Sequence, residues 1–443
     1  MGIVILIFAV VIEDAFAVYC IVTQSSQDKT RNLLRIGELA AFVACTLAAV
    51  IEWSARWYGL CALLLAWAAL AVWRLLRKPQ QEKPYSVRKT VFGGMLALLL
   101  VGIAVVPALV FPQYQLPPMT GKHQVVTVSY TYTDQSRIET FTSTGENRKV
   151  NVEFWYPEGT TGRYPLVVFS HGAFGMKAGN ASTFMELASN GYVVCSIDHP
   201  YHSLYTRGSD GRTVTIAPSF LQEVMNLDNG KYDELTGFQL EQKWIRLRKA
   251  DIHFVLDTII RNAKDPESGA VYQLIDAGKI GLMGHSLGGE ASAQVGRERN
   301  DIGAIIDLDA DLGGEYLDYA NGKYTLNDKV YPDPLLIIFT DEMVRRFARV
   351  TDPNLVIASR KVVASAPQAY EIDIPGTNHM SLTDLPLVSP FLVSMINSSF
   401  KAVGGSEADS YSVIKEMNSI TLNFFDVYLK NQGSFNPAEK YNE

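Results

Sequence analysis

The distribution of hydrophobic residues divides the chain into two parts. Long, almost uninterrupted apolar runs fill the first quarter and stop near residue 113. After that point hydrophobic residues occur in short runs or at alternating and helical spacings, separated by polar stretches. Apolar runs of roughly 20 residues cross a bilayer as helices, whereas short periodic runs are typical of a globular core. The pattern therefore predicts a helical membrane region followed by a globular domain.

Four apolar segments make up the first part. Each is close to the roughly 20 residues that span a bilayer as a helix, although the middle two are short. We expect about four transmembrane helices within residues 1–112, a proline-containing linker over 113–124 and one globular domain over 125–443. The four segments cover residues 3–22, 36–53, 57–73 and 91–112.

Positive charge in the connecting loops predicts the orientation of this region. The loop after the first segment holds three lysines or arginines, and the loop before the fourth segment holds six. The middle loop has only Arg56. Because loops rich in lysine and arginine remain in the cytoplasm, the first and third loops are expected inside. We therefore expect a multi-pass protein of the cell membrane whose globular domain is extracytoplasmic.

Two carboxylates, Glu13 and Asp14, lie in the middle of the first segment. An unpaired carboxylate at this depth costs several kcal/mol, so the pair needs an explanation. A functional one is a proton relay or a site for a lipid headgroup. A plainer one is a helix-packing or protonated pair, or a first segment that does not fully span, and we favour this second group.

The rest of the chain alternates between predicted strands and helices. Residues 125–132 and 150–156 alternate apolar and polar side chains, as antiparallel edge strands do. Six short apolar runs follow, as in parallel strands buried on both faces. This alternation predicts an α/β fold with a mostly parallel sheet. The six runs are 165–170, 192–197, 280–283, 304–308, 335–339 and 370–374, and the expected helices are 183–189, 244–260, 290–299, 343–359 and 410–429.

One motif in this part suggests a reaction. The run Gly284-His-Ser-Leu-Gly-Gly289 follows a predicted buried strand and precedes a predicted helix. In that context G-x-S-x-G forms a sharp turn that exposes a serine hydroxyl at the edge of a sheet. The N-terminus of the following helix favours negative charge beside that hydroxyl. We therefore predict that Ser286 is a nucleophile.

A serine nucleophile needs a base, an acid that orients the base, and donors for the developing oxyanion. His379, directly after the last predicted strand, is the histidine placed for the base. The residues leave the acid open between Asp309 and Asp341, each of which follows a strand between Ser286 and His379. For the oxyanion hole we predict the backbone amides of Leu287, the residue after the nucleophile, and Ala173, in a loop after an earlier strand. The loop in question is Phe169-Ser-His-Gly-Ala-Phe-Gly175.

Composition excludes several other classes of function. The 443 residues carry a formal net charge of -7 and no basic patch with interleaved aromatic residues, so we expect no nucleic-acid partner. The four cysteines lie in apolar runs and predict no disulfide framework. His199 and His202 form an H-x-x-H pair without a third metal ligand, so a turn or core role is favoured over a metal site. We expect neither a metal nor an organic cofactor.

Several motifs of the globular part carry a resemblance to a known family: Phe169-Ser-His-Gly172, Gly284-His-Ser-Leu-Gly-Gly289, Ile306-Asp-Leu-Asp-Ala310, and His379 followed by Ser381-Leu-Thr-Asp384 and Leu387-Val-Ser-Pro390. With these motifs the globular part resembles the platelet-activating-factor acetylhydrolase-like esterases of the α/β-hydrolase superfamily. The resemblance covers most of residues 125–430 and implies an α/β-hydrolase fold. That family carries its acid in a Leu-Asp-small context, which favours Asp309 over Asp341. Departures are Ala173, where the family often has a larger apolar residue, and the N-terminal helices.

Together these features predict a membrane-anchored serine esterase with the triad Ser286, Asp309 and His379. Its substrate is expected to be a small-molecule or lipid ester, with residues 203–240 forming a cap over the pocket. An acyltransferase with the same triad is an alternative, as is a non-enzymatic membrane sensor on a hydrolase fold. The complete set of candidate residues favours an enzyme.

Overall fold

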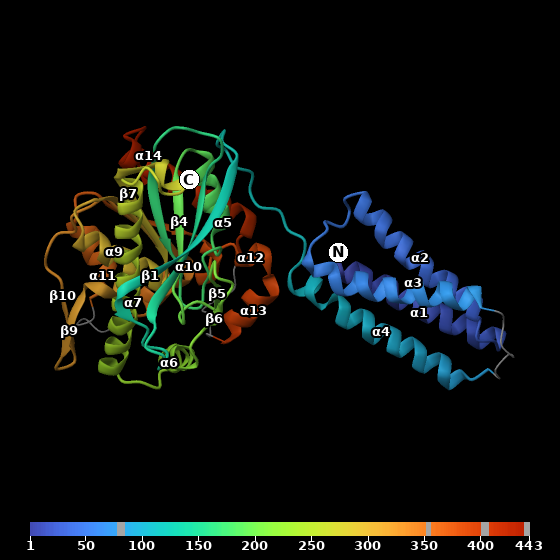
Figure 1. The fold of residues 1–443 in the computed structure, drawn as a ribbon. Coiled ribbons are helices and arrows are strands. Elements are labelled where there is room, and N and C mark those ends of the chain that lie inside the picture. Colours follow the sequence, from blue (N-terminus) through green and yellow to red (C-terminus); the bar gives the residue numbers. More distant parts are fainter. Residues whose placement is uncertain (78–84, 351–355, 400–406, 438–443) are drawn as a thin grey trace. The chain divides into compact units, whose positions relative to one another are not determined.

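The computed structural model describes residues 1–77, 85–350, 356–399 and 407–437. Contacts within the chain divide it into two compact units (Figure 1). The first, a helical unit, consists of residues 1–115 and 387–395. The second, an α/β unit, consists of residues 116–386 and 396–443.

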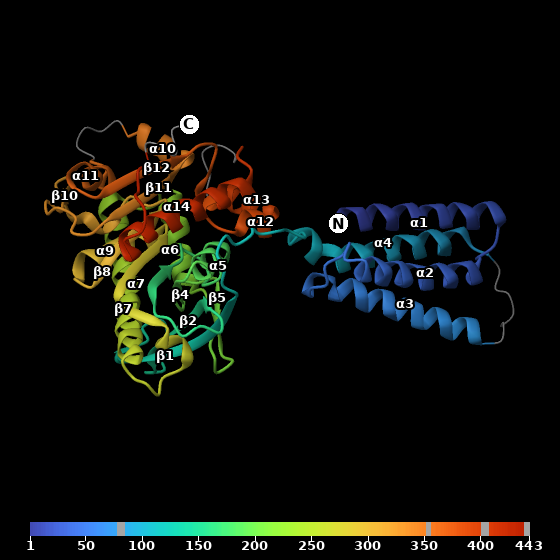
Figure 2. The ribbon, with the colours of Figure 1, turned by 90° about the horizontal axis from the view of Figure 1, so that it is seen from above.

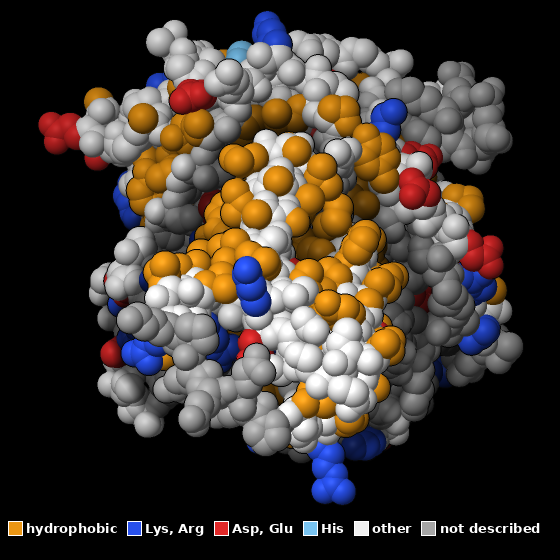
Figure 3. Space-filling model, turned by 90° about the vertical axis from the view of Figure 1, so that its right-hand side faces the viewer, with side chains coloured by type: hydrophobic (Ala, Val, Ile, Leu, Met, Phe, Trp, Pro, Cys, Tyr) orange, Lys and Arg blue, Asp and Glu red, His pale blue; other side chains and the backbone are white. Residues whose placement is uncertain are grey.

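Four long helices form most of the helical unit: α1 (Gly2–Thr23), α2 (Asp28–Leu47), α3 (Tyr58–Leu76) and α4 (Val87–Val110). A short 3-10 turn, η1 (Ala55–Trp57), leads into α3. Three segments are long and apolar enough to cross a membrane: Gly2–Thr23, Ala55–Leu76 and Val87–Val110. In Figure 3 hydrophobic side chains gather at the centre of the face shown, with few charged side chains between them.

The expectation of about four transmembrane helices is therefore corrected to three candidates. The second helix begins at Asp28 rather than near residue 36. Its first turns thus include Lys29, Arg31 and Arg35. These charges lower the mean hydropathy of the helix below that of a membrane span.

Glu13 is buried in the helical unit among positive side chains of α2. Its carboxylate forms ion pairs with Arg35 and, over 3.6 Å, with Arg31. Arg35 also pairs with Glu38 at 2.9 Å and lies 3.8 Å from the ring centroid of Trp67. A buried carboxylate with two guanidinium partners has contacts that suit helix packing.

The α/β unit is built on an eight-stranded sheet with the order β1-β2-β4-β3-β7-β8-β11-β12. The β1–β2 and β2–β4 pairs are antiparallel, and the remaining pairs are parallel. All eight predicted strands are present, with the two alternating ones at one edge. The strands are β1 (Val125–Ile138), β2 (Asn147–Pro157), β3 (Tyr164–Ser170), β4 (Val193–Asp198), β7 (Ile275–His285), β8 (Ile302–Leu308), β11 (Leu335–Thr340) and β12 (Ala369–Ile374).

Helices cover both faces of this sheet (Figure 2). One hydrophobic core contains Ile252 of α7 (Glu234–Ala263) and Ala291 of α9 (Leu287–Glu298). The other contains Phe184 of α5 (Ala181–Ser189) and Phe424 of α14 (Ser410–Lys430). The parallel strands are thus buried on both faces, which explains why their sequences are continuous apolar runs.

The register of the sheet gathers several loops at one edge. Ser170 at the end of β3 pairs with Gly284 near the end of β7, and His285 pairs with Leu308 at the end of β8. On the far side Thr340 of β11 pairs with Ile374 of β12. The carboxyl ends of all these strands therefore lie together, where ligand sites of open α/β sheets form.

Several short elements differ from the sequence-based expectation. The single helix expected over 343–359 is two helices, α10 (Asp341–Ala348) and α11 (Ala358–Ser365), and residues 351–355 lie outside the described part. Two short hairpins were missed because strands of three to five residues are too short to show a clear alternation of apolar and polar side chains. The remaining elements are β5 (Tyr205–Arg207), β6 (Thr213–Thr215), α6 (Pro218–Asp228), α8 (Ala270–Gln273), η2 (Gly313–Glu315), β9 (Tyr316–Ala320), β10 (Lys323–Leu326), η3 (His379–Leu382), α12 (Leu385–Val388) and α13 (Pro390–Ser399).

Candidate active site

Ser286 occupies a strained turn between β7 and α9. Its φ of 54° and ψ of -131° lie in a region that side chains rarely adopt. Such strain persists only where the surroundings enforce it, and it is concentrated at functional sites. Leu287 is the first residue of α9, so its amide has no acceptor inside the helix. The turn therefore places a hydroxyl and a free amide side by side.

The glycines of the motif allow backbone segments to approach this turn closely. A Cβ on Gly284 would lie 2.2 Å from the carbonyl oxygen of Gly288. A Cβ on Gly288 would lie 2.0 Å from the carbonyl oxygen of Ser170, at the end of β3. The turn is thus wedged between two strand ends at distances that no other residue permits.

His379 and Asp309 are joined by a short hydrogen bond. His379 Nδ1 lies 2.6 Å from Asp309 Oδ2, so the ring donates from Nδ1 to the carboxylate. Asp309 is 1% exposed, whereas the imidazole of His379 is 34% exposed. Burial alone would raise the pKa of Asp309. The hydrogen bond and charge of His379, together with hydrogen bonds from the amide and hydroxyl of Thr340, outweigh burial and lower that pKa. The carboxylate is therefore ionised beside an accessible imidazole.

Of the two aspartates that the residues left open, only Asp309 contacts the imidazole. Asp341 accepts a hydrogen bond from the Gly376 amide over 3.3 Å and pairs with Arg345 at 3.0 Å. It thus stabilises the start of α10 and the loop ahead of His379. The structure brings Asp309 to His379 and leaves Asp341 in this supporting position.

One contact of a Ser-His-Asp triad, the hydrogen bond between the serine hydroxyl and the imidazole, is not formed among the described residues. Within the described residues no hydrogen bond joins Ser286 Oγ to the His379 ring. Ser286 and His379 lie near each other, because His285, the chain neighbour of Ser286, contacts His379. The two histidine rings are 4.6 Å apart, and His285 Nε2 donates to the His379 carbonyl over 3.0 Å. Such catalytic hydrogen bonds are often long without substrate and tighten in the Michaelis complex.

The loop that supplies Ala173 lies against the nucleophile. A Cβ on Gly172 would lie 3.2 Å from Ser286 Cβ. The Gly172 carbonyl accepts hydrogen bonds from His171 Nδ1 at 2.6 Å, from Arg248 Nη2 at 3.1 Å and from the Gly175 amide at 3.1 Å. Among the described residues no carbonyl accepts a hydrogen bond from the Ala173 amide. That amide is therefore available to a ligand.

A second Ser-His-Asp arrangement lies behind this loop. Ser170 Oγ is 2.9 Å from His199 Nε2, and His199 Nδ1 is 3.0 Å from Asp251 Oδ2. All three side chains are fully buried. Burial lowers the pKa of His199 to about 4, despite the hydrogen bond to Asp251, so the ring is a poor base at neutral pH. These residues support the fold, and His199 takes the core role predicted for it.

Sequence-based reasoning missed Arg248 and Asp251, although the helix that carries them was predicted. Arg248 lies three residues after Ile245 and four before Ile252, both buried apolar positions of α7. It therefore falls on the apolar stripe of the helix, where a charge is unusual. A charged residue within that stripe was the available signal.

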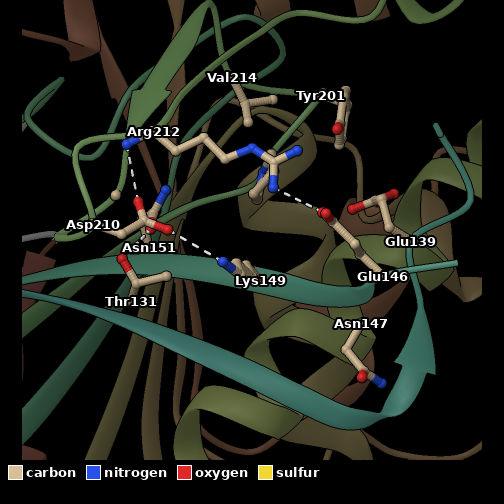
Figure 4. A pocket seen from close by; sticks show the side chains of 12 residues that line it. Thr131, Glu139, Glu146, Asn147, Lys149, Asn151, Tyr201, Asp210, Arg212 and Val214 are labelled. Atoms are coloured by element: carbon tan, nitrogen blue, oxygen red, sulfur yellow. Dashed lines mark hydrogen bonds and ion pairs between the residues drawn. The ribbon is translucent and has the colours of Figure 1, made fainter. Parts of the chain in front are cut away.

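Two surface hollows lie near the α/β unit's cap region. The one in Figure 4 has a volume of about 40 Å³ and is lined by polar side chains held in ion pairs such as Arg212–Glu146. It is far smaller than the roughly 300–1,000 Å³ of ligand pockets. A second hollow, of about 500 Å³, is lined by Phe141, Tyr201 and residues 212–219. Its lining is more polar than apolar, but its apolar residues Phe141 and Ala217 belong to the cluster that contains Ala173 and Leu287.

No group of three or more histidine, cysteine, aspartate or glutamate side chains in the described residues has the arrangement of a metal site. His202, the second member of the H-x-x-H pair, stacks on Phe220 with ring centroids 3.7 Å apart. Both histidines of that pair therefore pack in the interior.

Comparison with known proteins gives three findings. The family model for platelet-activating factor acetylhydrolase, isoform II, matches residues 119–443. Platelet-activating factor acetylhydrolases from Bos taurus and Canis lupus familiaris are 25% and 28% identical over 289 and 290 residues. Each alignment covers 62% of this chain and 59% of the relative, so the match spans about three fifths of those proteins.

A ferulic acid esterase from Streptomyces cinnamoneus has a similar structure, with a TM-score of 0.55 and 19% identity. The alignment covers 74% of this chain and 96% of that one. At this identity the likeness shows the fold, and it confirms the predicted α/β architecture with a mostly parallel sheet.

Proposed function

The chain belongs to the platelet-activating factor acetylhydrolase, isoform II, family, and on that premise we propose that it is a membrane-anchored serine esterase. We propose the triad Ser286, Asp309 and His379, with Ala173 and Leu287 as oxyanion donors. The observation that carries the proposal is the 2.6 Å hydrogen bond between a buried Asp309 and His379, close to a strained Ser286.

In the first half-reaction Ser286 Oγ attacks the ester carbonyl carbon while His379 Nε2 takes its proton. The carbonyl oxygen becomes an oxyanion, which accepts hydrogen bonds from the amides of Ala173 and Leu287. Each such donor is typically worth about 3–4 kcal/mol of transition-state stabilisation. The intermediate collapses when the ester C–O bond breaks and His379 returns the proton to the leaving alcohol.

In the second half-reaction water attacks the acyl group on Ser286. His379 takes a proton from this water, and a second tetrahedral oxyanion forms in the same hole. Its collapse breaks the bond to Ser286 Oγ, which regains the proton from His379. The carboxylic acid leaves, and the enzyme returns to its starting state. Throughout, Asp309 holds the ring by Nδ1 and stabilises its positive form.

A lipid-type ester suits the surroundings of the site. The apolar cluster beside the predicted oxyanion donors includes Phe220 and Trp244, from α6 and α7. The hollow of about 500 Å³ shares the apolar residues Phe141 and Ala217 with this cluster and is large enough for a short acyl or alkyl group. Residues of the predicted cap, 203–240, supply part of both.

We also propose that the α/β unit is extracytoplasmic. With three candidate spans, the loops after α1 and before α4 fall on opposite sides of the bilayer. The loop before α4 carries the larger positive charge, which favours the cytoplasm for that loop. Alkaline phosphatase fused after Glu443 should be active in intact cells and a fluorescent protein there should be dark; the reverse result would contradict this orientation.

The esterase proposal is tested with p-nitrophenyl esters of graded chain length and detergent-solubilised full-length protein. Wild type should release p-nitrophenol with a preference among chain lengths, and Ser286→Ala should fall to the background rate. Hydrolysis retained in Ser286→Ala would exclude the proposed mechanism. Product analysis with added alcohol separates hydrolysis from acyl transfer.

A further inference from the structure

Arg248 is a fully buried cation directed at the loop beside the nucleophile. Its Nη1 donates to the carbonyl of His171, and its Nη2 donates to the carbonyl of Gly172 over 3.1 Å. The planar guanidinium thus holds two consecutive carbonyls from one side, which a lysine ammonium cannot do as well.

The charge of Arg248 has no direct carboxylate partner among the described residues. Asp251, one turn further along α7, is occupied by Arg148, by Arg137 and by His199. Burial lowers the pKa of Arg248 to about 9, although Asp251 and Glu290 act in the opposite direction. Burying a cation against neutral carbonyls is costly, so the position calls for a purpose other than stability.

The geometry of the peptide bond links Arg248 to the predicted oxyanion donor. In a planar trans peptide, the carbonyl of one residue and the amide N–H of the next point in opposite directions. When Arg248 and His171 hold the Gly172 carbonyl on one side, the Ala173 N–H must point to the other. Gly172 lies against Ser286, so the peptide that carries this N–H is next to the nucleophile.

We propose that Arg248 is a positioning residue for catalysis, which orients and polarises the Ala173 amide by holding the carbonyls of His171 and Gly172. A hydrogen bond to a carbonyl strengthens the N–H of the same peptide as a donor, because bonds in a chain polarise one another. A cation makes this effect larger than a neutral donor does. The inference rests on the proposed role of Ser286.

The chain offers a matched control in Arg297. Its Nη1 also donates to two consecutive carbonyls, Lys329 and Val330, at 3.2 Å each, and its Nε pairs with Glu315 at 2.7 Å. It is largely buried, with 12% of its side chain exposed, but it contacts none of the proposed site residues. Arg297→Met therefore removes a similar clamp elsewhere in the unit.

The test compares Arg248→Met, Arg248→Lys and Arg297→Met in full-length protein with p-nitrophenyl butyrate. For Arg248→Met we expect kcat to fall by about 10- to 100-fold with KM changed less than about threefold, because the amide acts on the transition state. Arg248→Lys should be intermediate. Affinity for a phenylboronic acid, which forms a tetrahedral adduct on the serine, should fall in parallel with kcat, and melting temperatures report the structural effect.

The inference is overturned if Arg248→Met keeps kcat within about threefold of wild type, or if Arg297→Met loses as much. If Arg248→Met does not fold, the kcat of Arg248→Lys, measured below its melting temperature, is compared with wild type and Arg297→Met in the same way. If wild type and Ser286→Ala hydrolyse equally, the proposed function fails instead. The rate of Ser286 labelling by a fluorophosphonate then tests Arg248, since that reaction also places negative charge on an oxygen in the hole.

Discussion

Asp309 and His379, 70 positions apart in the sequence, share a 2.6 Å hydrogen bond because β8 and β12 flank β11. Asp309 follows β8 directly and has a positive φ of 63°. That turn directs its carboxylate across the end of β11, where the amide and hydroxyl of Thr340 donate to it at 2.7 and 2.9 Å. These two donors therefore fix the carboxylate before it meets the imidazole.

Replacing the acid should separate Asp309 from Asp341. For Asp309→Asn we expect kcat to fall by about 10⁴-fold, because an amide in this place favours the wrong imidazole tautomer. Asp341→Asn should keep kcat within about threefold, since it removes a partly exposed ion pair with Arg345 and leaves an oxygen that can still accept from the Gly376 amide. Steady-state kinetics on a p-nitrophenyl ester measure both. A loss confined to Asp341→Asn would reverse the assignment.

The lowered pKa of Asp309 also predicts how its contribution to stability depends on pH. A carboxylate whose folded pKa lies below its unfolded value of 3.8 adds stability above that value, and loses it as pH falls through the folded pKa. The free energy of unfolding of wild type should therefore exceed that of Asp309→Asn by about 2 kcal/mol at pH 7. Melting temperatures from pH 7 down to pH 3 should converge below about pH 4. A constant difference would mean that the carboxylate charge is not the cause.

The eight strands of the sheet were predictable because six are short apolar runs and the two at one edge alternate apolar and polar side chains. The positions of Ser286 and His379, each directly after a predicted strand, followed from the same pattern. Which aspartate meets His379 did not follow, because two strands in succession end in an aspartate and only the family resemblance distinguished them. Arg248 was missed because its partners are backbone carbonyls of a loop 76 positions away, which no local pattern reveals.

In the helical unit the prediction failed for a different reason. Helix α2 was expected to be apolar, yet it begins early enough to include arginines. Their partner is Glu13 of α1, a contact between two helices that hydropathy along one segment does not register. The β9–β10 hairpin was missed for a different reason, since strands of five and four residues are too short for a periodic pattern to identify them.

Two serines next to histidines give a second test of the site. Ser286→Ala should lower kcat by at least about 10³-fold. Ser170→Ala removes only a buried hydrogen bond to His199, so it should cost about 1 kcal/mol of stability and leave kcat within about tenfold. Kinetics and thermal unfolding of the two variants measure the contrast. If fluorophosphonate labelling were lost in Ser170→Ala and retained in Ser286→Ala, the nucleophile would be Ser170 and the assignment of Ser286 would be wrong.

The second glycine after the nucleophile should be irreplaceable for a steric reason. A Cβ on Gly289 would lie 1.8 Å from Asp307 Oδ1 in the buried end of β8. Gly289→Ala should therefore lower the free energy of unfolding by about 3 kcal/mol or more, or prevent folding. Gly278→Ala places its Cβ 3.4 Å from Asp276 Oδ1, an ordinary contact, and should stay within about 0.5 kcal/mol of wild type. Thermal unfolding measures both, and equal melting temperatures for the two variants would refute the steric argument.

The two adjacent carboxylates of α1 should differ sharply in their effect on stability. Glu13 is buried and paired with Arg31 and Arg35, whereas Asp14 is exposed on the helix. Removing one partner of a buried ion pair leaves an uncompensated charge and costs about 3–5 kcal/mol. Glu13→Gln should therefore lower the melting temperature of the detergent-solubilised protein by several degrees, and Asp14→Asn should leave it almost unchanged.

Activity distinguishes this packing role from a proton relay. A packing role for Glu13 predicts that esterase activity of folded Glu13→Gln equals that of wild type at temperatures below the melting point of the variant. A double change, Glu13→Gln with Arg35→Gln, should recover part of the lost stability, since the buried charge is then removed on both sides. Loss of activity in Glu13→Gln without loss of stability, and no recovery in the double variant, would instead indicate that the carboxylate takes part in function.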